Sequence, residues 1–187
     1  MRNRISILAL AMGAMLAGPV SPLVAPAAAQ SATTSRDVMR DRLITLLTQV
    51  GKRNDVNIDF HQSDKNPYNV TGFLKTGLKN EDGLEVVWSV SKSDTIAMRA
   101  YPHYNGAYIN LDKVRDYPGF MRTLLKLNDT NFMYWGADDT NDVFVAYEFT
   151  LESGFPTEAI TVVARSIPNQ DQFVGQLRPF VDGTHGS

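Results

Sequence analysis

The sequence predicts an α+β protein with a single antiparallel sheet and helices packed on one face of that sheet. Apolar residues recur at helical spacing in three stretches and at alternate positions in six others. The predicted strands are grouped before and after a central helix and do not alternate singly with helices, which is typical of antiparallel sheets. The predicted order is therefore α-β-β-β-β-α-β-β-α.

The first predicted helix occupies residues 36–50. Thr34 or Ser35 can cap its start, and Gly51 is typical of a residue just past a helix end. Charged side chains at 40–42 separate the apolar positions, which are Val38, Leu43, Ile44, Leu46, Leu47 and Val50. This spacing indicates one apolar face that packs on the rest of the fold.

After Gly51 the apolar period changes from that of a helix to two residues. Alternation predicts strands over 56–60, 70–74, 84–90 and 96–100. Turn-forming residues lie at 80–83 and 92–94, so short connections join the last three of these strands as antiparallel neighbours.

The second half of the chain predicts a helix, two strands and a final helix. Pro118 suits the first turn of a helix whose apolar face runs over 120–127. Strands follow over 132–135 and 143–149, with a turn at 138–141. The last helix starts near 156–158, and Pro168 must kink or restart it because proline has no N–H to donate.

The first 29 residues have the pattern of a secretory signal peptide. Arg2 and Arg4 precede an apolar stretch, and small residues at 27–29 suit a signal peptidase. The sequence therefore predicts a bacterial protein that is periplasmic or secreted. The predicted organisation is a removed signal peptide at 1–29, a disordered start at 30–35, one domain at 36–181 and a disordered tail at 182–187.

Composition excludes several classes of function. Without Arg2 and Arg4 the chain has 16 basic and 20 acidic residues, a net charge of −4, and no basic patch that indicates nucleic acid. No stretch after the predicted signal peptide reaches the ~20 apolar residues of a membrane span. There is no cysteine, which excludes a thiolate nucleophile and cysteine-bound zinc.

No motif predicts a catalytic, cofactor or metal site, so the expectation is a protein that is not an enzyme and has no cofactor. His61, His103 and His185 lack zinc-site spacing and are read as ordinary solvent-facing histidines. The acidic run at 138–142 offers oxygens to calcium, yet a hairpin turn is the favoured interpretation.

Four tyrosines are the candidate partner-binding residues. They lie in or beside a segment with little regular pattern and are Tyr101, Tyr104, Tyr108 and Tyr117. Tyrosine is enriched at interfaces because its ring is apolar and its hydroxyl can hydrogen-bond. The favoured interpretation is that these rings cover the core, and the alternative is a surface for a partner or ligand.

Core and turn residues over 124–132, 143–149 and 154–160, together with Phe173, resemble the YbjN domain family, the bacterial sensory transduction regulators. The resemblance extends over almost all of the chain after residue 29. It implies a fold similar to type III secretion chaperones, which are small α+β proteins that bind partner proteins. Members commonly lie in the cytoplasm, so the signal peptide is a departure.

The resulting hypothesis is an exported, non-enzymatic module that binds another protein in a regulatory or chaperone-like role, and a homodimer would fit it. The first alternative is a periplasmic protein that binds a small ligand or lipid with the tyrosine segment. A hydrolase with an unrecognised site is the third hypothesis.

Overall fold

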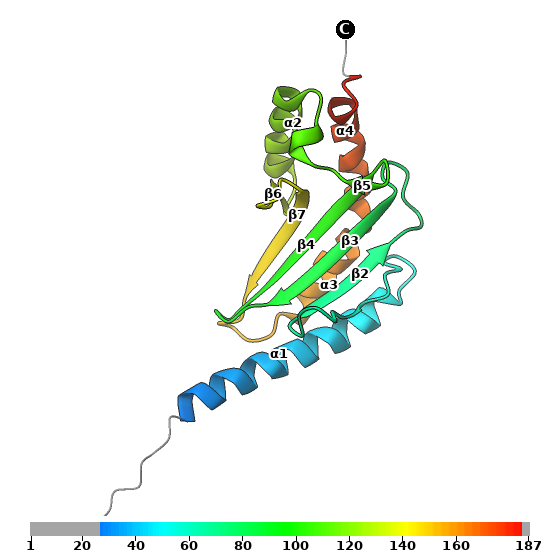
Figure 1. Ribbon diagram of the computed structural model, residues 1–187. Coiled ribbons are helices and arrows are strands. Elements are labelled where there is room, and N and C mark those ends of the chain that lie inside the picture. Colours follow the sequence, from blue (N-terminus) through cyan, green and yellow to red (C-terminus); the bar gives the residue numbers. More distant parts are fainter. Residues whose placement is uncertain (1–26, 185–187) are drawn as a thin grey trace, which may run out of the picture.

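The computed structural model describes residues 27–184 and contains one antiparallel sheet of seven strands. Its order is β1-β2-β3-β4-β7-β6, and β5 pairs with the end of β4. The strands are β1 (His61–Gln62), β2 (Asn69–Leu74), β3 (Gly83–Val90), β4 (Thr95–Tyr104), β5 (Ala107–Tyr108), β6 (Tyr134–Ala137) and β7 (Val143–Thr150). Helices lie against one face of this sheet (Figure 1), which confirms the predicted fold class.

The helical elements of the described residues follow the predicted order. They are α1 (Ala27–Gly51), η1 (Leu111–Lys113), α2 (Tyr117–Thr130), α3 (Thr157–Ser166), η2 (Pro168–Gln170) and α4 (Asp171–Val181). Asp116 caps α2 by accepting a hydrogen bond from the Gly119 N–H at 3.0 Å. As predicted, Pro168 interrupts the last helix, because α3 ends before it and a short 3₁₀ turn leads into α4.

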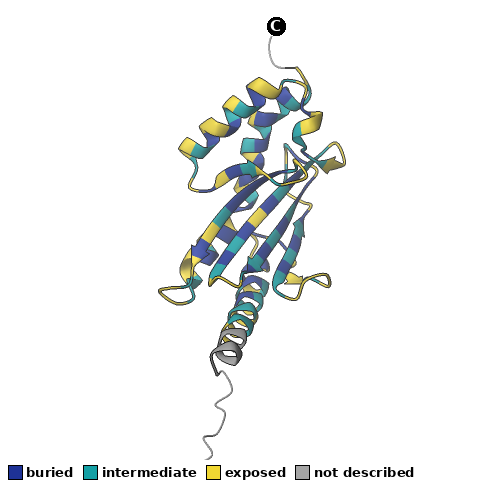
Figure 2. Ribbon diagram, turned by 60° about the vertical axis from the view of Figure 1, so that its left-hand side comes forward, coloured by how far each residue is buried: buried dark blue, intermediate teal, exposed yellow. Residues whose placement is uncertain are grey.

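The core lies between the sheet and the helices. In β3 and β4 every second side chain points to the helices and is buried, so buried and less buried positions alternate along these strands (Figure 2). The buried set includes Val86, Trp88, Ile96 and Met98 from the sheet, and Leu43, Leu47, Ile160, Val163, Val174 and Leu177 from the helices. Trp88 and Trp135 are core residues, as predicted.

The first predicted strand is shorter than the alternation indicates. Val56, Ile58 and Phe60 are buried in alternation, but ladder pairing with β2 begins only at His61. Asn57 has a φ of 52°, which interrupts the extended backbone. A Cβ on Gly72 would lie 2.4 Å from Ile58 Cγ2, so glycine is what allows this segment to approach β2.

The described residues extend past both predicted ends of the domain. The backbone of α1 begins at Ala27, so residues 30–35 are helical; no proline or glycine separates them from the anchored part of the helix. The tail is fixed as far as Thr184, because Asp182 accepts a 2.7 Å hydrogen bond from the Tyr104 hydroxyl and Thr184 N donates to the Pro179 carbonyl. Residues 185–187 and most of the predicted signal peptide lie outside the described residues.

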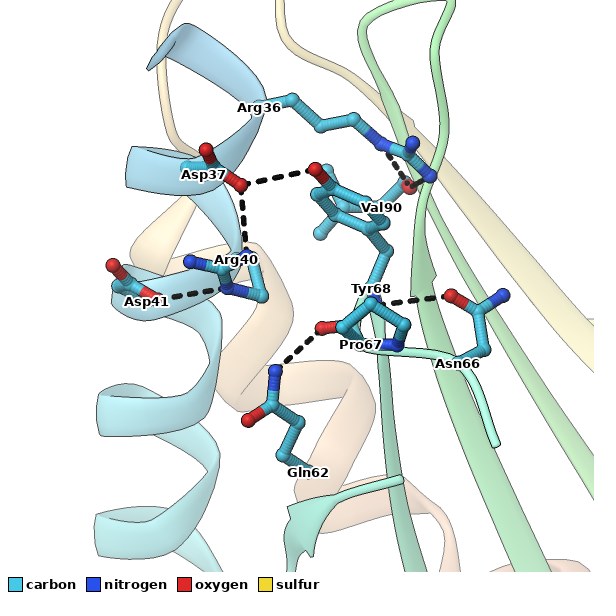
Figure 3. A network of polar contacts seen from close by, with 9 residues as sticks. All are labelled: Arg36, Asp37, Arg40, Asp41, Gln62, Asn66, Pro67, Tyr68 and Val90. Carbon is cyan, nitrogen blue, oxygen red and sulfur yellow. Dashed lines mark hydrogen bonds and ion pairs between the residues drawn. The ribbon is translucent and has the colours of Figure 1, made fainter. Parts of the chain in front are cut away.

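A polar network anchors α1 to the end of the sheet (Figure 3). The Arg36 guanidinium donates from Nε and Nη2 to the Val90 carbonyl at 3.0 and 2.6 Å, and lies 3.4 Å from the centroid of the Tyr68 ring. The Tyr68 hydroxyl donates to Asp37 Oδ1 at 3.0 Å, and Arg40 donates to the same oxygen at 2.8 Å. Tyr68 is therefore held by α1 through both its ring and its hydroxyl.

We expect Tyr68→Ala to loosen the N-terminal half of α1 and to lower the free energy of unfolding by about 1 to 2 kcal/mol, because the variant loses one charge-assisted hydrogen bond and one cation–π contact. Hydrogen exchange should quicken over residues 36–42 and stay unchanged in β3 and β4. Tyr68→Phe, which keeps the ring, serves as the matched control with a smaller loss. Unchanged exchange in both variants would show that the network does not hold the helix.

Candidate functional site

The structure brings two of the four candidate tyrosines together. Tyr101 on β4 and Tyr108 on β5 lie with their ring centroids 5.7 Å apart. Tyr101 falls between the buried residues Ala100 and Pro102, so it lies on the face of the sheet opposite to the helices. Both rings are partly exposed rather than buried under a long connection.

The other two tyrosines lie elsewhere. Tyr104 ends β4 and bonds to Asp182 beyond α4, with the Arg178 guanidinium 4.7 Å from its ring centroid. Tyr117 opens α2 and is 48% exposed. Among the described residues, neither shows a ring contact with Tyr101 or Tyr108, so the four rings do not pack into one cluster.

A continuous row of rings crosses the uncovered face of the sheet, and we call it the aromatic stripe. Neighbouring centroids along it are 4.4 to 6.4 Å apart, within the usual range of aromatic contacts. In spatial order its members are Phe73 on β2, His103 on β4, Tyr108 on β5, Tyr101 on β4, Phe144 on β7 and Tyr134 on β6. The stripe therefore spans the sheet from β2 to β6.

Strand register explains why these rings meet. Phe73 pairs with Glu85, and Glu85 pairs with Tyr101, so all three stand in one row across β2, β3 and β4. On β7 the pairing of Ala100 with Val145 places Phe144 beside Tyr101. Each residue belongs to the set that alternates with the buried core positions of its strand.

Glu85 forms the polar centre of the stripe. Its Oε2 accepts a short hydrogen bond from the Tyr108 hydroxyl and lies 3.9 Å from His103 Nε2. Burial, followed by the bond to Glu85, raises the pKa of Tyr108. Burial lowers the pKa of His103 against the opposing effect of Glu85, so this histidine is mainly neutral near pH 7.

Two cations flank the stripe. The guanidinium of the exposed Arg99 lies 4.5 Å from the Phe144 centroid, and the Lys75 ammonium lies 5.5 Å from the Phe73 centroid. Tyr134 is 46% exposed at the β6 end. The stripe thus combines packed rings with exposed positive charge near both ends.

The geometry offers little for metal or histidine chemistry. Within residues 27–184 no group of three or more His, Asp or Glu side chains is arranged to hold a metal ion. The 138–142 segment is the favoured hairpin turn: Asp138 Oδ1 accepts from the backbone N–H groups of Thr140 and Asp142. His61 is exposed on β1, apart from the stripe, and His185 lies outside the described residues. In the described part, no helix is long and apolar enough for a membrane span.

Sequence reasoning missed four members of the stripe, namely Phe73, His103, Tyr134 and Phe144. Their signal was present in the alternation, since Phe73 and Phe144 are aromatic residues at positions out of phase with the core residues of their strands, although Phe144 is itself only 6% exposed. An aromatic ring at an outward position on a strand is a useful marker of such a face.

Comparison with known proteins assigns no family to this chain. No family model matches the chain, and no curated protein matches it. Among solved structures, a chain from the crystal structure of the ExsC-ExsE complex is similar, with a TM-score of 0.42 and 12% identity. The match covers 74% of this chain and 94% of that chain. Membership of the YbjN family therefore stays a prediction from the sequence.

Proposed function

We propose that this chain is an exported, non-enzymatic, YbjN-like module that binds a partner protein with the aromatic stripe, in a regulatory or chaperone-like role. The observation that carries this proposal is the row of six rings on the sheet face that the helices leave uncovered. The signal-peptide pattern at the start of the sequence supports a role outside the cytoplasm.

The stripe has the physical properties of a binding surface. Aromatic and arginine side chains are enriched where interfaces are strongest. The rings already pack on one another, so binding a partner orders few additional side chains and costs little conformational entropy. Glu85 accepts the Tyr108 hydroxyl at the centre of the stripe, and Arg99 and Lys75 present exposed positive charge near its two ends. A segment with apolar side chains flanked by carboxylates fits this surface.

The experiment is capture from the native bacterium with the full chain carrying a C-terminal tag, so that the predicted signal peptide is left intact. The test variant is the double change Arg99→Glu and Tyr134→Ala, because both side chains are exposed and the fold should survive. We expect the affinity for the captured protein to fall about 30-fold or more, as for loss of a hot spot worth about 2 kcal/mol.

Leu125→Ala is the matched control, since Leu125 is 63% exposed on α2 and lies outside the stripe. Capture should be unchanged in this variant. If the partner is lost with Leu125→Ala and retained with the double variant, α2 is the binding surface and the proposal is wrong.

A further inference from the structure

A partly enclosed cavity lies beside the β4–β5 hairpin, between η1 and the end of α4. Its volume is about 320 Å³, at the lower end of the range for small-molecule sites. Tyr104 and Tyr108 both line it, although the Tyr104 hydroxyl donates to Asp182 and the Tyr108 hydroxyl donates to Glu85. The cavity is distinct from the aromatic stripe, which it touches only through Tyr108.

Part of the lining is apolar and already organised. Ile109 and Val181 contribute aliphatic surface, and the two tyrosines contribute rings. Both hydroxyl protons are engaged, since Tyr104 donates to Asp182 Oδ2 and Tyr108 donates to Glu85. A molecule in the cavity therefore contacts the rings of these two tyrosines, whose hydroxyl protons are not free to donate to it.

The charges of the lining favour an anion. Lys113 and Arg115 are both exposed cations on the lining, and Asp182 is its acidic residue. The Asp182 carboxylate accepts the Tyr104 hydroxyl, and its backbone carbonyl accepts Arg115 Nη1 at 3.1 Å. Within the described residues Lys113 makes no ion pair. The lining is net positive on a chain whose formal net charge is −2.

Further charges of both signs lie just outside the lining. The Arg178 guanidinium on α4 lies 4.7 Å from the Tyr104 ring centroid, directly behind one wall. The neighbouring carboxylate of Asp112 accepts a hydrogen bond from Asn141 Nδ2 at 3.1 Å and is not part of the lining. The carboxylates of Glu85 and Asp142 accept hydrogen bonds from the lining residues Tyr108 and Asn110, so the preference for an anion rests on Lys113 and Arg115, the two cations on the lining itself.

We propose that this cavity binds a small organic anion, with an apolar and preferably aromatic body beside Tyr104 and Tyr108 and its charged group against Lys113 and Arg115. The proposal does not depend on the aromatic stripe being a protein-binding surface. The expected ligand is a monocarboxylate or monosulfonate of about ten to fifteen non-hydrogen atoms, bound in the cavity that the tyrosine segment lines.

The test compares the binding of two probes of nearly equal shape, phenylacetate and 2-phenylethanol. The protein is ¹⁵N-labelled and purified from its native bacterium. We expect saturable shifts of amide signals over residues 104–115 and 181–184 with phenylacetate. The neutral alcohol should bind about tenfold more weakly or worse, because it lacks the charge that the two cations attract. Higher salt should weaken phenylacetate binding only.

Lys113→Met keeps the length of the side chain and removes its charge, and it should weaken phenylacetate about five- to tenfold. Lys92→Met is the control, because Lys92 is exposed at the distant β3–β4 turn. This variant should bind phenylacetate with the affinity of the unchanged protein. Equal affinity for the two probes, shifts confined to other regions, or no saturation would each overturn the proposal.

Discussion

Glu81→Gln is expected to stabilise the protein strongly at neutral and alkaline pH. Glu81 is only 7% exposed, and neither carboxyl oxygen has a hydrogen-bond partner among the described residues. Burial, followed by the nearby charges of Asp171 and Asp82, raises its pKa from the ordinary 4.5 to about 8. A neutral amide at this position avoids the cost of a buried, unpaired negative charge.

The direction of the pH dependence follows from the raised pKa. Between about pH 4.5 and 8 the folded protein keeps the Glu81 proton while the unfolded chain releases it. The folded state binds more protons, so stability falls as the pH rises through this range and then levels off above the pKa of the folded state. The total loss is at most about 5 kcal/mol.

Urea unfolding of both proteins from pH 4.5 to 9 measures this effect. The two free energies of unfolding should agree near pH 4.5 and should diverge steadily up to about pH 8, with Glu81→Gln the more stable. Glu148→Gln is the control, because Glu148 is an exposed residue of β7, and it should follow the unchanged protein. Parallel profiles for Glu81→Gln and the unchanged protein would mean that Glu81 carries its charge in the folded state.

Asp171→Ala should be destabilising by about 2 to 4 kcal/mol at pH 5, because one carboxylate joins α4 to a distant loop. Asp171 is 8% exposed and accepts hydrogen bonds from the Lys79 N–H at 3.1 and 3.0 Å, the Asn80 N–H at 2.8 Å and Asn80 Nδ2 at 3.0 Å. As the first residue of α4, its negative charge also favours the helix N-terminus.

The cost of Asp171→Ala should become smaller as the pH rises toward about 8 and should level off above it. Removing the Asp171 charge lowers the pKa of Glu81 in the folded protein, so up to about pH 8 the variant loses less stability than the unchanged protein. The same urea series measures this change, with Asp171→Asn as a control that keeps one acceptor oxygen. A cost that does not vary with pH would show that the two carboxyl groups do not interact.

Loop 79–82 also connects to the surfaces described above. The Asp82 N–H donates to the His103 carbonyl at 2.8 Å, and Asp82 Oδ2 accepts from the Gly106 N–H at 2.8 Å. The loop thus joins α4 to the β4–β5 hairpin, which carries His103 and Tyr108. A local opening of the loop around Glu81 is therefore expected to affect His103 and Tyr108 before it affects Phe144 on β7.

Local signals in the sequence predicted most of the elements. The alternation over 84–90 and 96–100, the start of α2 near Pro118 and the break at Pro168 all depend on residues a few positions apart. Such interactions form within one helix or strand, so their pattern can be read directly from the sequence. The short extent of β1 was not predicted, because it depends on how closely Ile58 and Phe60 approach Gly72.

The sequence by itself determined the fold class and the alternation that separates a buried from an uncovered sheet face. Only the tertiary structure decided which tyrosines meet: Tyr101 and Tyr108 join rings from β2, β6 and β7, whereas Tyr104 turns to α4. The burial of Glu81 beside Asp171, 90 residues later in the chain, is of the same kind. These contacts follow from strand register and helix packing, which join residues far apart in sequence and therefore leave no periodic signal along it.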